Sequence, residues 1–167
     1  MRLPRPQPCR RLLKWVGEAM RIKTVHFGEI EIEPGDVLTI RGGLIPFVGF
    51  EQFVLLSYED EEPFQWLQSV QIPELAVVTV PVAAAFPDFQ PRLPMELRQW
   101  MRLAEDEEPL WLATVVLAER IEEMTANLLA PIALNLEARR GKQVVQELDT
   151  EWARKPLIES VIVREGA

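Results

Sequence analysis

The side chains best suited to acid–base, nucleophilic or metal chemistry are scarce in this chain and lie far apart. It has one histidine, His26, and one cysteine, Cys9. A structural zinc site uses about four histidine or cysteine ligands, so these two residues cannot supply one. His26 stands in a strand-like stretch without a serine or cysteine motif beside it, and we interpret it as a structural or surface residue. We therefore expect no metal and no cofactor, and neither residue is a candidate catalytic base or nucleophile.

Two runs of carboxylates, at residues 59–62 and 105–108, are the other groups that could do chemistry. Neither run has the alternating oxygen ligands and the central glycine of a calcium-binding loop. The sequence also gives no positive sign of catalysis by a carboxylate pair. Short runs of like charge are typical of solvated loops, and we interpret both runs in that way.

The charge of the chain is distributed unevenly, and this limits its partners. The net charge is −8 over 167 residues, whereas residues 1–19 hold five basic residues against one acidic residue, a net +4. The rest of the chain therefore carries −12, which repels nucleic acid and favours basic partners. A lone cysteine fits a reducing compartment, and no apolar run is long enough to span a membrane. We expect a cytoplasmic protein that binds neither nucleic acid nor membrane and is a monomer when unbound.

The elements that must position these groups are mostly strands. Short apolar stretches with period-two or fully buried patterns are separated by turns, which is typical of a closed or nearly closed barrel. One helix is indicated, because Leu93, Leu97, Trp100 and Met101 share a face and Pro94 stands near its first turn. The sequence predicts a mainly β, small antiparallel barrel-like domain with one short helix. The expected strands are 22–27, 29–33, 37–40, 53–58, 64–69, 76–80, 110–117, 125–135, 143–146 and 157–163. For the last segment a helix is the alternative.

The chain divides at Met20. Residues 20–167 are expected to form a single domain, and residues 1–19 a basic extension that turns helical after its prolines. Charges interrupt its apolar residues, so a secretory signal is not indicated. Two interpretations remain open. The extension is either dispensable, with translation starting at Met20, or a basic helix that lies on a membrane surface.

The most unusual stretch is Thr125–Asn135, which is almost wholly apolar yet contains Asn127, Pro131 and Asn135. Proline donates no hydrogen bond to a strand ladder, so a central strand containing one needs a compensating feature. The two amides either tie a bulge or the Pro131 break to a neighbouring strand or contact a partner. Three carboxylates just before this stretch, Glu119, Glu122 and Glu123, are candidates for contact with a basic partner.

A second unusual stretch is the segment 42–51, named here the glycine loop. It carries Phe47 and Phe50 among glycine and proline. These aromatics either close one end of the barrel or offer apolar surface to a partner. The glycine spacing matches neither nucleotide-binding motif.

Several ordered segments of the chain resemble the FliW family of flagellar assembly factors. The most specific is the stretch 125–135, which matches the pattern Thr-x-Asn-Leu-x-Ala-Pro-Ile-x-x-Asn. Residues 22–30, 63–70, 141–145 and 155–157 match further family segments in the same order. The family usually spells its loop Gly-(Leu/Ile)-Pro-Gly-Phe-Glu, whereas this chain reaches Gly49-Phe50-Glu51 only through a longer loop. Residues 1–19 have no counterpart.

The resemblance implies a barrel-like cytoplasmic protein that is not an enzyme. It implies that the chain binds flagellin and, when free, binds the translational repressor CsrA, which relieves repression of flagellin mRNA. The candidate contact residues are then Glu119, Glu122, Glu123, Asn127, Asn135, Phe47 and Phe50. Two other classes remain open. One is a small-molecule-binding or enzymatic β-barrel with an unidentified ligand, and the other is a structural subunit of a larger assembly.

Overall fold

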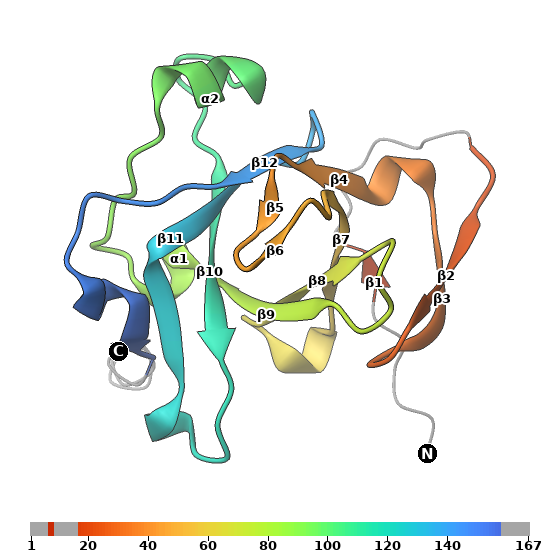
Figure 1. Ribbon diagram of the computed structural model, residues 1–167, viewed down its shortest axis with the longest axis horizontal. Coiled ribbons are helices and arrows are strands. Elements are labelled where there is room, and N and C mark those ends of the chain that lie inside the picture. The colour runs from red at the N-terminus through yellow and green to blue at the C-terminus, as the bar shows by residue number, and fades with distance from the viewer. Residues whose placement is uncertain (1–6, 9–16, 158–167) are drawn as a thin grey trace.

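The computed structural model describes residues 7–8 and 17–157 of the chain. Seven strands form a barrel that Figure 1 shows roughly end-on. They are β4 (Val37–Ile40), β7 (Gln52–Ser57), β8 (Gln65–Ser69), β9 (Ala76–Pro81), β10 (Leu110–Val116), β11 (Thr125–Asn135) and β12 (Arg140–Gln143). Their order is β7–β4–β12–β11–β10–β9–β8, and β8 pairs back onto β7 to close the ring. The mainly β barrel predicted from the sequence is therefore confirmed.

The barrel is antiparallel except along one seam. Strands β12 and β4 pair in parallel, with Arg140 opposite Thr39 and Gly141 opposite Ile40. On its other side β12 packs closely on β11, because a Cβ on Gly141 would lie 2.4 Å from Leu134 Cδ2 and 2.9 Å from the Ala133 carbonyl oxygen. Glycine at this position therefore allows β11 and β12 to approach each other.

Shorter elements surround the barrel. The hairpin of β2 (Met20–Thr24) and β3 (Gly28–Ile32) lies to one side in Figure 1, and the hairpin of β5 (Gly43–Leu44) and β6 (Phe47–Val48) lies across the near mouth. Strand β1 (Gln7–Pro8) pairs with β7, and β13 (Lys155–Pro156) pairs with β11. The helical turns are α1 (Val82–Ala85), α2 (Met95–Trp100), η1 (Pro34–Asp36), η2 (Glu59–Glu61), η3 (Ile121–Glu123) and η4 (Thr150–Arg154).

Three sequence expectations differ from this structure. The strand expected at 143–146 lies three residues earlier, as β12, because the turn before it ends at Arg139. The one expected helix is present as α2. Helix α1 was not expected, because a four-residue turn is too short to produce a helical pattern in the sequence. Val25 was placed in a strand, whereas it lies in the turn between β2 and β3 with 62% of its surface exposed. The turn ends at Gly28, which has a φ of 68° and begins β3. The expected strand 157–163, beyond Leu157, and most of the expected basic helix lie outside the described residues.

The apolar side chains form three layers. Ten buried side chains fill the barrel interior: Leu38, Ile40, Leu44, Phe53, Leu55, Leu67, Leu75, Leu112, Ile132 and Leu134. A second cluster around Trp111 and Met101 packs α1 and the segment 86–103 against the outside of β10 and β11. A third packs the β2–β3 hairpin onto Val54 and Leu56 of β7. Within the described residues, no helix is long and apolar enough to cross a membrane.

Candidate protein-binding surfaces

Strand β11 does not run straight beside β10, and Asn127 sits where it deviates. Thr114 of β10 lies opposite Asn127, but Leu112 lies opposite Ile132, so residues 128–131 of β11 face only Ala113. The Asn127 Oδ1 atom accepts hydrogen bonds from the backbone N–H groups of Leu129 (3.0 Å) and Ala130 (3.1 Å). Such an Asx turn satisfies two donors that the widened ladder cannot. Asn127 is thus an internal tie that shapes the bulge.

Two buried glutamines complete the region around Pro131. Extending the register of β11 and β12 places Pro131 opposite Val144, and the Val144 N–H donates to the Pro131 carbonyl oxygen at 2.8 Å. In such a pair the opposite residue normally donates its own N–H in exchange, and Pro131 has none to donate. The Val144 carbonyl oxygen instead accepts a hydrogen bond from Gln146 Nε2 at 3.2 Å. Gln143 Nε2 donates to the Ala130 carbonyl oxygen at 3.0 Å. The break caused by Pro131 is therefore repaired by side-chain amides.

Asn135 ends the same strand with a similar turn. Its Oδ1 atom accepts from the N–H groups of Glu137 (3.1 Å) and Ala138 (3.3 Å). Its Nδ2 atom donates to the carbonyl oxygen of Met101 at 2.8 Å, which ties the β11–β12 turn to the end of α2. The hydrogen bonds of both asparagines thus fit the interpretation that they tie the backbone around β11 together. Contact of either residue with a partner stays a prediction.

The three candidate carboxylates lie together at the end of the β10–β11 hairpin. This region, residues 117–124, is named the acidic tip, and in Figure 1 it projects beyond the barrel. Glu119, Glu122 and Glu123 are all exposed, and η3 holds the last two in one helical turn. Arg120 Nε lies 3.6 Å from Glu122 Oε2 in an exposed ion pair. Such pairs contribute about 0–1 kcal/mol, so the carboxylates stay hydrated and accessible to a cation.

Apolar side chains accompany the charges of the acidic tip. The exposed fractions of Val116, Leu117 and Ile121 are 64%, 51% and 40%. A surface that mixes carboxylates with aliphatic groups suits a partner that is basic and partly apolar. Strand β13 pairs with the start of β11 and so holds the strand that follows the acidic tip.

The glycine loop is anchored tightly although its side chains are exposed. The Gly42 N–H donates to Glu51 Oε1 at 2.7 Å, and the Ile45 N–H donates to Gln143 Oε1 at 2.8 Å. Gly43 has a φ of 78°, and a Cβ there would lie 2.7 Å from the Phe47 carbonyl oxygen. The backbone is therefore fixed at both ends and folded closely on itself.

In this loop the structure assigns the closing of the barrel end and the exposed apolar surface to different residues. Leu44 is 1% exposed and belongs to the cluster inside the barrel, so Leu44 is the residue that closes this end. Phe47 and Phe50 remain 44% and 38% exposed, beside Ile45 and Val48 at 61% and 70%. The anchored loop thus offers four exposed apolar side chains for contact with a partner.

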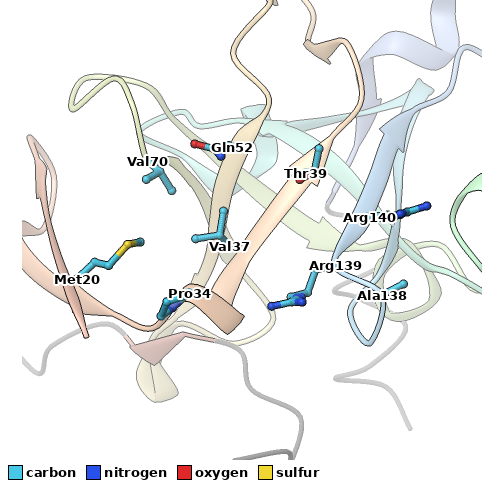
Figure 2. Close-up of a pocket in the computed structure, with 9 residues that line it drawn as sticks. All are labelled: Met20, Pro34, Val37, Thr39, Gln52, Val70, Ala138, Arg139 and Arg140. Atoms are coloured by element: carbon cyan, nitrogen blue, oxygen red, sulfur yellow. The ribbon is translucent and has the colours of Figure 1, made fainter. Parts of the chain in front are cut away.

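A cleft lies at the open end of the parallel seam between β4 and β12 (Figure 2). In that view Arg139 points toward Pro34, whereas Arg140 points away from the cleft. Arg140 Nη1 donates to the Trp100 carbonyl oxygen at 2.6 Å, and its guanidinium lies 5.3 Å from the centre of the Trp100 ring. The cleft is lined by Met20, Pro34, Val37, Thr39, Gln52, Val70, Ala138, Arg139 and Arg140. This lining does not assemble a general acid and base, and the described residues hold no cluster of three or more potential metal ligands.

The buried glutamines are the site residues that sequence reasoning missed. Glutamine is usually exposed, so it was not considered for the interior. A usable signal was present, because Gln143 and Gln146 flank Val144 and Val145 within an expected strand. His26, by contrast, is exposed and lies tilted against Trp66 with 5.5 Å between ring centres, as expected of a structural or surface residue.

Comparison with known proteins identifies the same family that the sequence motifs resemble. The family model described as "FliW protein" matches residues 21–157. The chain is similar to the flagellar assembly factor FliW of Caldanaerobacter subterraneus subsp. tengcongensis, with 34% identity over 143 residues, which is 85% of this chain and 95% of that protein. It is also similar to FliW of Geotalea uraniireducens, with 35% identity over 141 residues, covering 84% of this chain and 86% of the relative.

The fold is shared as well. A crystal structure of the flagellar assembly factor FliW superposes with a TM-score of 0.75 at 30% identity. The match covers 83% of this chain and 96% of that one. The family match over residues 21–157 therefore includes every strand of the barrel.

Proposed function

The chain belongs to the FliW family of flagellar assembly factors, and on that premise we propose that it is a cytoplasmic, non-enzymatic partner switch. It binds flagellin and, once flagellin is gone, binds CsrA and relieves the repression of flagellin mRNA. The observation that carries this proposal is the pair of unlike exposed surfaces, the acidic tip and the glycine loop, on a barrel whose interior is already filled.

The acidic tip is assigned to CsrA. CsrA binds RNA, so it must present positive charge, and the tip offers three exposed carboxylates with one arginine among them. Charge complementarity of this kind steers the encounter and raises the association rate. The exposed aliphatic residues Leu117 and Ile121 supply the apolar contact that charge alone lacks.

The glycine loop is assigned to flagellin. Its exposed Phe47 and Phe50 are anchors of the kind that dominate binding free energy when a partner buries them. Because the backbone is fixed by Gln143 and Glu51, little conformational entropy is lost on binding.

With two surfaces, exclusion of one partner by the other needs either a partner large enough to cover both or a coupling free energy between them. Flagellin is added to a preformed complex of this protein with CsrA, and the species are separated by size-exclusion chromatography. Displacement of CsrA supports the switch. A ternary complex with unchanged affinities removes exclusion from the proposal, and binding to neither protein overturns the function altogether.

Reversal of two charges tests the acidic tip. Glu122→Lys with Glu123→Lys is expected to lower the CsrA association rate about tenfold at low salt, with a smaller difference at high salt. The matched control is Glu105→Lys with Asp106→Lys, which changes the net charge equally on an exposed loop elsewhere. Equal effects of the two pairs would show that only the net charge matters, and the assignment of the tip would be wrong.

The rival class, a barrel that holds a small molecule, gains no support from the structure. Ten apolar side chains occupy the interior, so a ligand would have to bind outside it.

A further inference from the structure

Three cations gather on the outer face of the parallel seam between β4 and β12. Ile40 fills the barrel interior, so the residue after it, Arg41, lies on the outer side. Arg140 and Lys142 lie on the outer side of β12, because Gly141 between them is buried. Arg41 is exposed, and the other two are half-buried. Arg41, Arg140 and Lys142 are named the seam cations.

The Trp100 ring, at the end of α2, lies against two of the seam cations. The guanidinium carbons of Arg41 and Arg140 lie 5.5 Å and 5.3 Å from the centre of the ring. Arg140 also donates one hydrogen bond to the Trp100 carbonyl oxygen. A guanidinium has five N–H donors, and contact with an aromatic face uses none of them. Both arginines are therefore held in place while most of their donors remain available to a ligand.

No carboxylate neutralises these charges in the part of the chain that the structure describes. The ion pairs there join other side chains. Residues 37–50 and 138–146, which supply the seam and most of the glycine loop, contain no Asp or Glu, although the whole chain has 26. Glu51, at the end of the loop, accepts the Gly42 N–H. The seam cations therefore form a local positive site on a protein of negative net charge.

The seam cations adjoin the glycine loop. Arg41 directly precedes Gly42, and Lys142 Nζ donates to the Arg41 carbonyl oxygen at 2.9 Å. The same Nζ atom lies 2.9 Å from the position that a Cβ on Gly42 would take. The next residue of β12, Gln143, holds the Ile45 N–H, and β5 lies beside β12 in Figure 1. The exposed apolar side chains of the loop therefore begin where the seam cations end.

A surface of this composition selects an acidic segment that also carries apolar residues. Carboxylates can pair with the seam cations, while apolar side chains cover Phe47 and Val48, which are 44% and 70% exposed. A basic segment would meet like charges and be disfavoured. The acidic tip has the opposite sign, so the protein can distinguish its partners by charge.

We propose that the seam cations and the glycine loop form one docking surface, that its occupant is an acidic and partly apolar segment, and that the seam cations keep a basic partner away from it. This inference rests on the proposed assignment of the glycine loop to flagellin. It adds three residues to that site and specifies the chemistry of the flagellin segment that docks there.

The first test reverses two of the seam cations. In Arg41→Glu with Lys142→Glu, the flagellin association rate should fall at least about tenfold at low salt, and the difference should shrink at high salt. The CsrA association rate should not fall. Stopped-flow measurements at two salt concentrations give both rates, and thermal melts show whether the variant is folded. Arg41→Glu alone, at an exposed side chain, is the second variant and should slow flagellin association about threefold.

The matched control reverses two exposed cations elsewhere, in Lys23→Glu with Arg92→Glu, and changes the net charge equally. Equal losses in the two pairs would mean that only net charge matters, and the docking surface would be wrong. Flagellin binding that the seam variants leave unchanged would overturn this inference and leave the proposed function intact. An unaltered protein that binds neither flagellin nor CsrA would overturn both.

The second test identifies the occupant. In the complex of the full-length proteins, the flagellin segment that becomes protected from hydrogen exchange should carry more acidic than basic residues. Replacing two of its acidic residues by lysine should weaken binding to the unaltered protein at least about tenfold. The same change should restore binding to Arg41→Glu with Lys142→Glu, because each partner then carries the other's charge. A basic protected segment, or no restoration by the exchanged charges, would overturn the inference.

Discussion

The glycine loop and the acidic tip are both exposed, yet they are built in opposite ways. The loop has apolar side chains on a backbone fixed by Gln143, Glu51 and the close packing at Gly43. The tip has charged side chains on a single helical turn, whose internal bonds are Glu123 N–H to Arg120 and Met124 N–H to Ile121. One surface depends on shape and the other on charge.

This difference predicts how each surface responds to change. Substitutions in the loop should alter stability and dissociation rates, because they disturb packing and buried area. Substitutions in the tip should alter association rates and their salt dependence, with little effect on stability. The predictions below test that division, from the largest expected effect to the smallest.

Gly43→Ala should be the most damaging change in either region. A Cβ there would lie 2.7 Å from the Phe47 carbonyl oxygen and 2.8 Å from that of Phe50, at a φ of 78°. Left-handed strain and overlap together should cost about 3 kcal/mol, and Tm should fall by about 6–12 °C in a thermal melt followed by circular dichroism. The control is Gly49→Ala, whose φ is 96° but whose Cβ would meet no atom within 4 Å. If both variants lose equal stability, close packing at Gly43 is not what fixes the loop.

Gln143→Leu should release the same loop from the barrel. The substitution leaves the Ile45 N–H and the Ala130 carbonyl oxygen without the partners that Gln143 supplies. Unpaired buried groups of this kind cost about 2 kcal/mol, measurable by urea unfolding, and hydrogen exchange at Ile45 should accelerate. Gln52→Leu, at an exposed glutamine on β7, serves as the control and should change stability by less than about 0.5 kcal/mol. Unchanged exchange at Ile45 would contradict the anchoring role.

The barrel could be predicted from the sequence because its signals are local. Alternating apolar residues and the mostly apolar run 76–80 each indicate a strand, and the turn at residues 34–36 separates two of them. Short connections then leave few ways to pair the strands. The parallel seam between β4 and β12 was not predictable. It joins residues about a hundred positions apart. No local pattern marks it, because a glycine at position 141 is explained equally well by a turn.

The candidate surfaces were predictable only in part. The exposure of the carboxylates before Thr125 could be predicted because charged side chains are rarely buried, and the structure places them at the end of a hairpin. The two asparagines in the sequence indicated that β11 is an irregular strand. Only the structure shows that Asn127 Oδ1 accepts hydrogen bonds from the backbone of its own strand. In the glycine loop, sequence could not separate Leu44, which is buried, from Phe47, because both are apolar and the difference lies in the direction of each side chain.

Phe47→Ser with Phe50→Ser should break the partner contact of the loop while leaving the barrel intact. Both rings are more than a third exposed, so their loss removes little of the core. Flagellin affinity should fall at least about tenfold through faster dissociation, and the loss should be the same at low and high salt. Surface plasmon resonance with flagellin and CsrA on parallel channels distinguishes the surfaces. A salt-dependent loss, or an equal loss of CsrA binding, would show that the division between the two surfaces is wrong.

Arg120→Gln should give the smallest effect and the sharpest test of the acidic tip. Arg120 forms an exposed ion pair with Glu122 at 3.6 Å, and such pairs contribute little, so stability should change by less than about 0.5 kcal/mol. Removing the one cation of the tip makes its field more negative, so the CsrA association rate in stopped-flow measurements should rise about twofold at low salt and converge with the unaltered rate at high salt. Arg120→Lys keeps the charge without the guanidinium and should leave the rate unchanged. A slower rate in Arg120→Gln would mean that Arg120 itself contacts the partner, and the tip would then recognise shape in the same way as the loop.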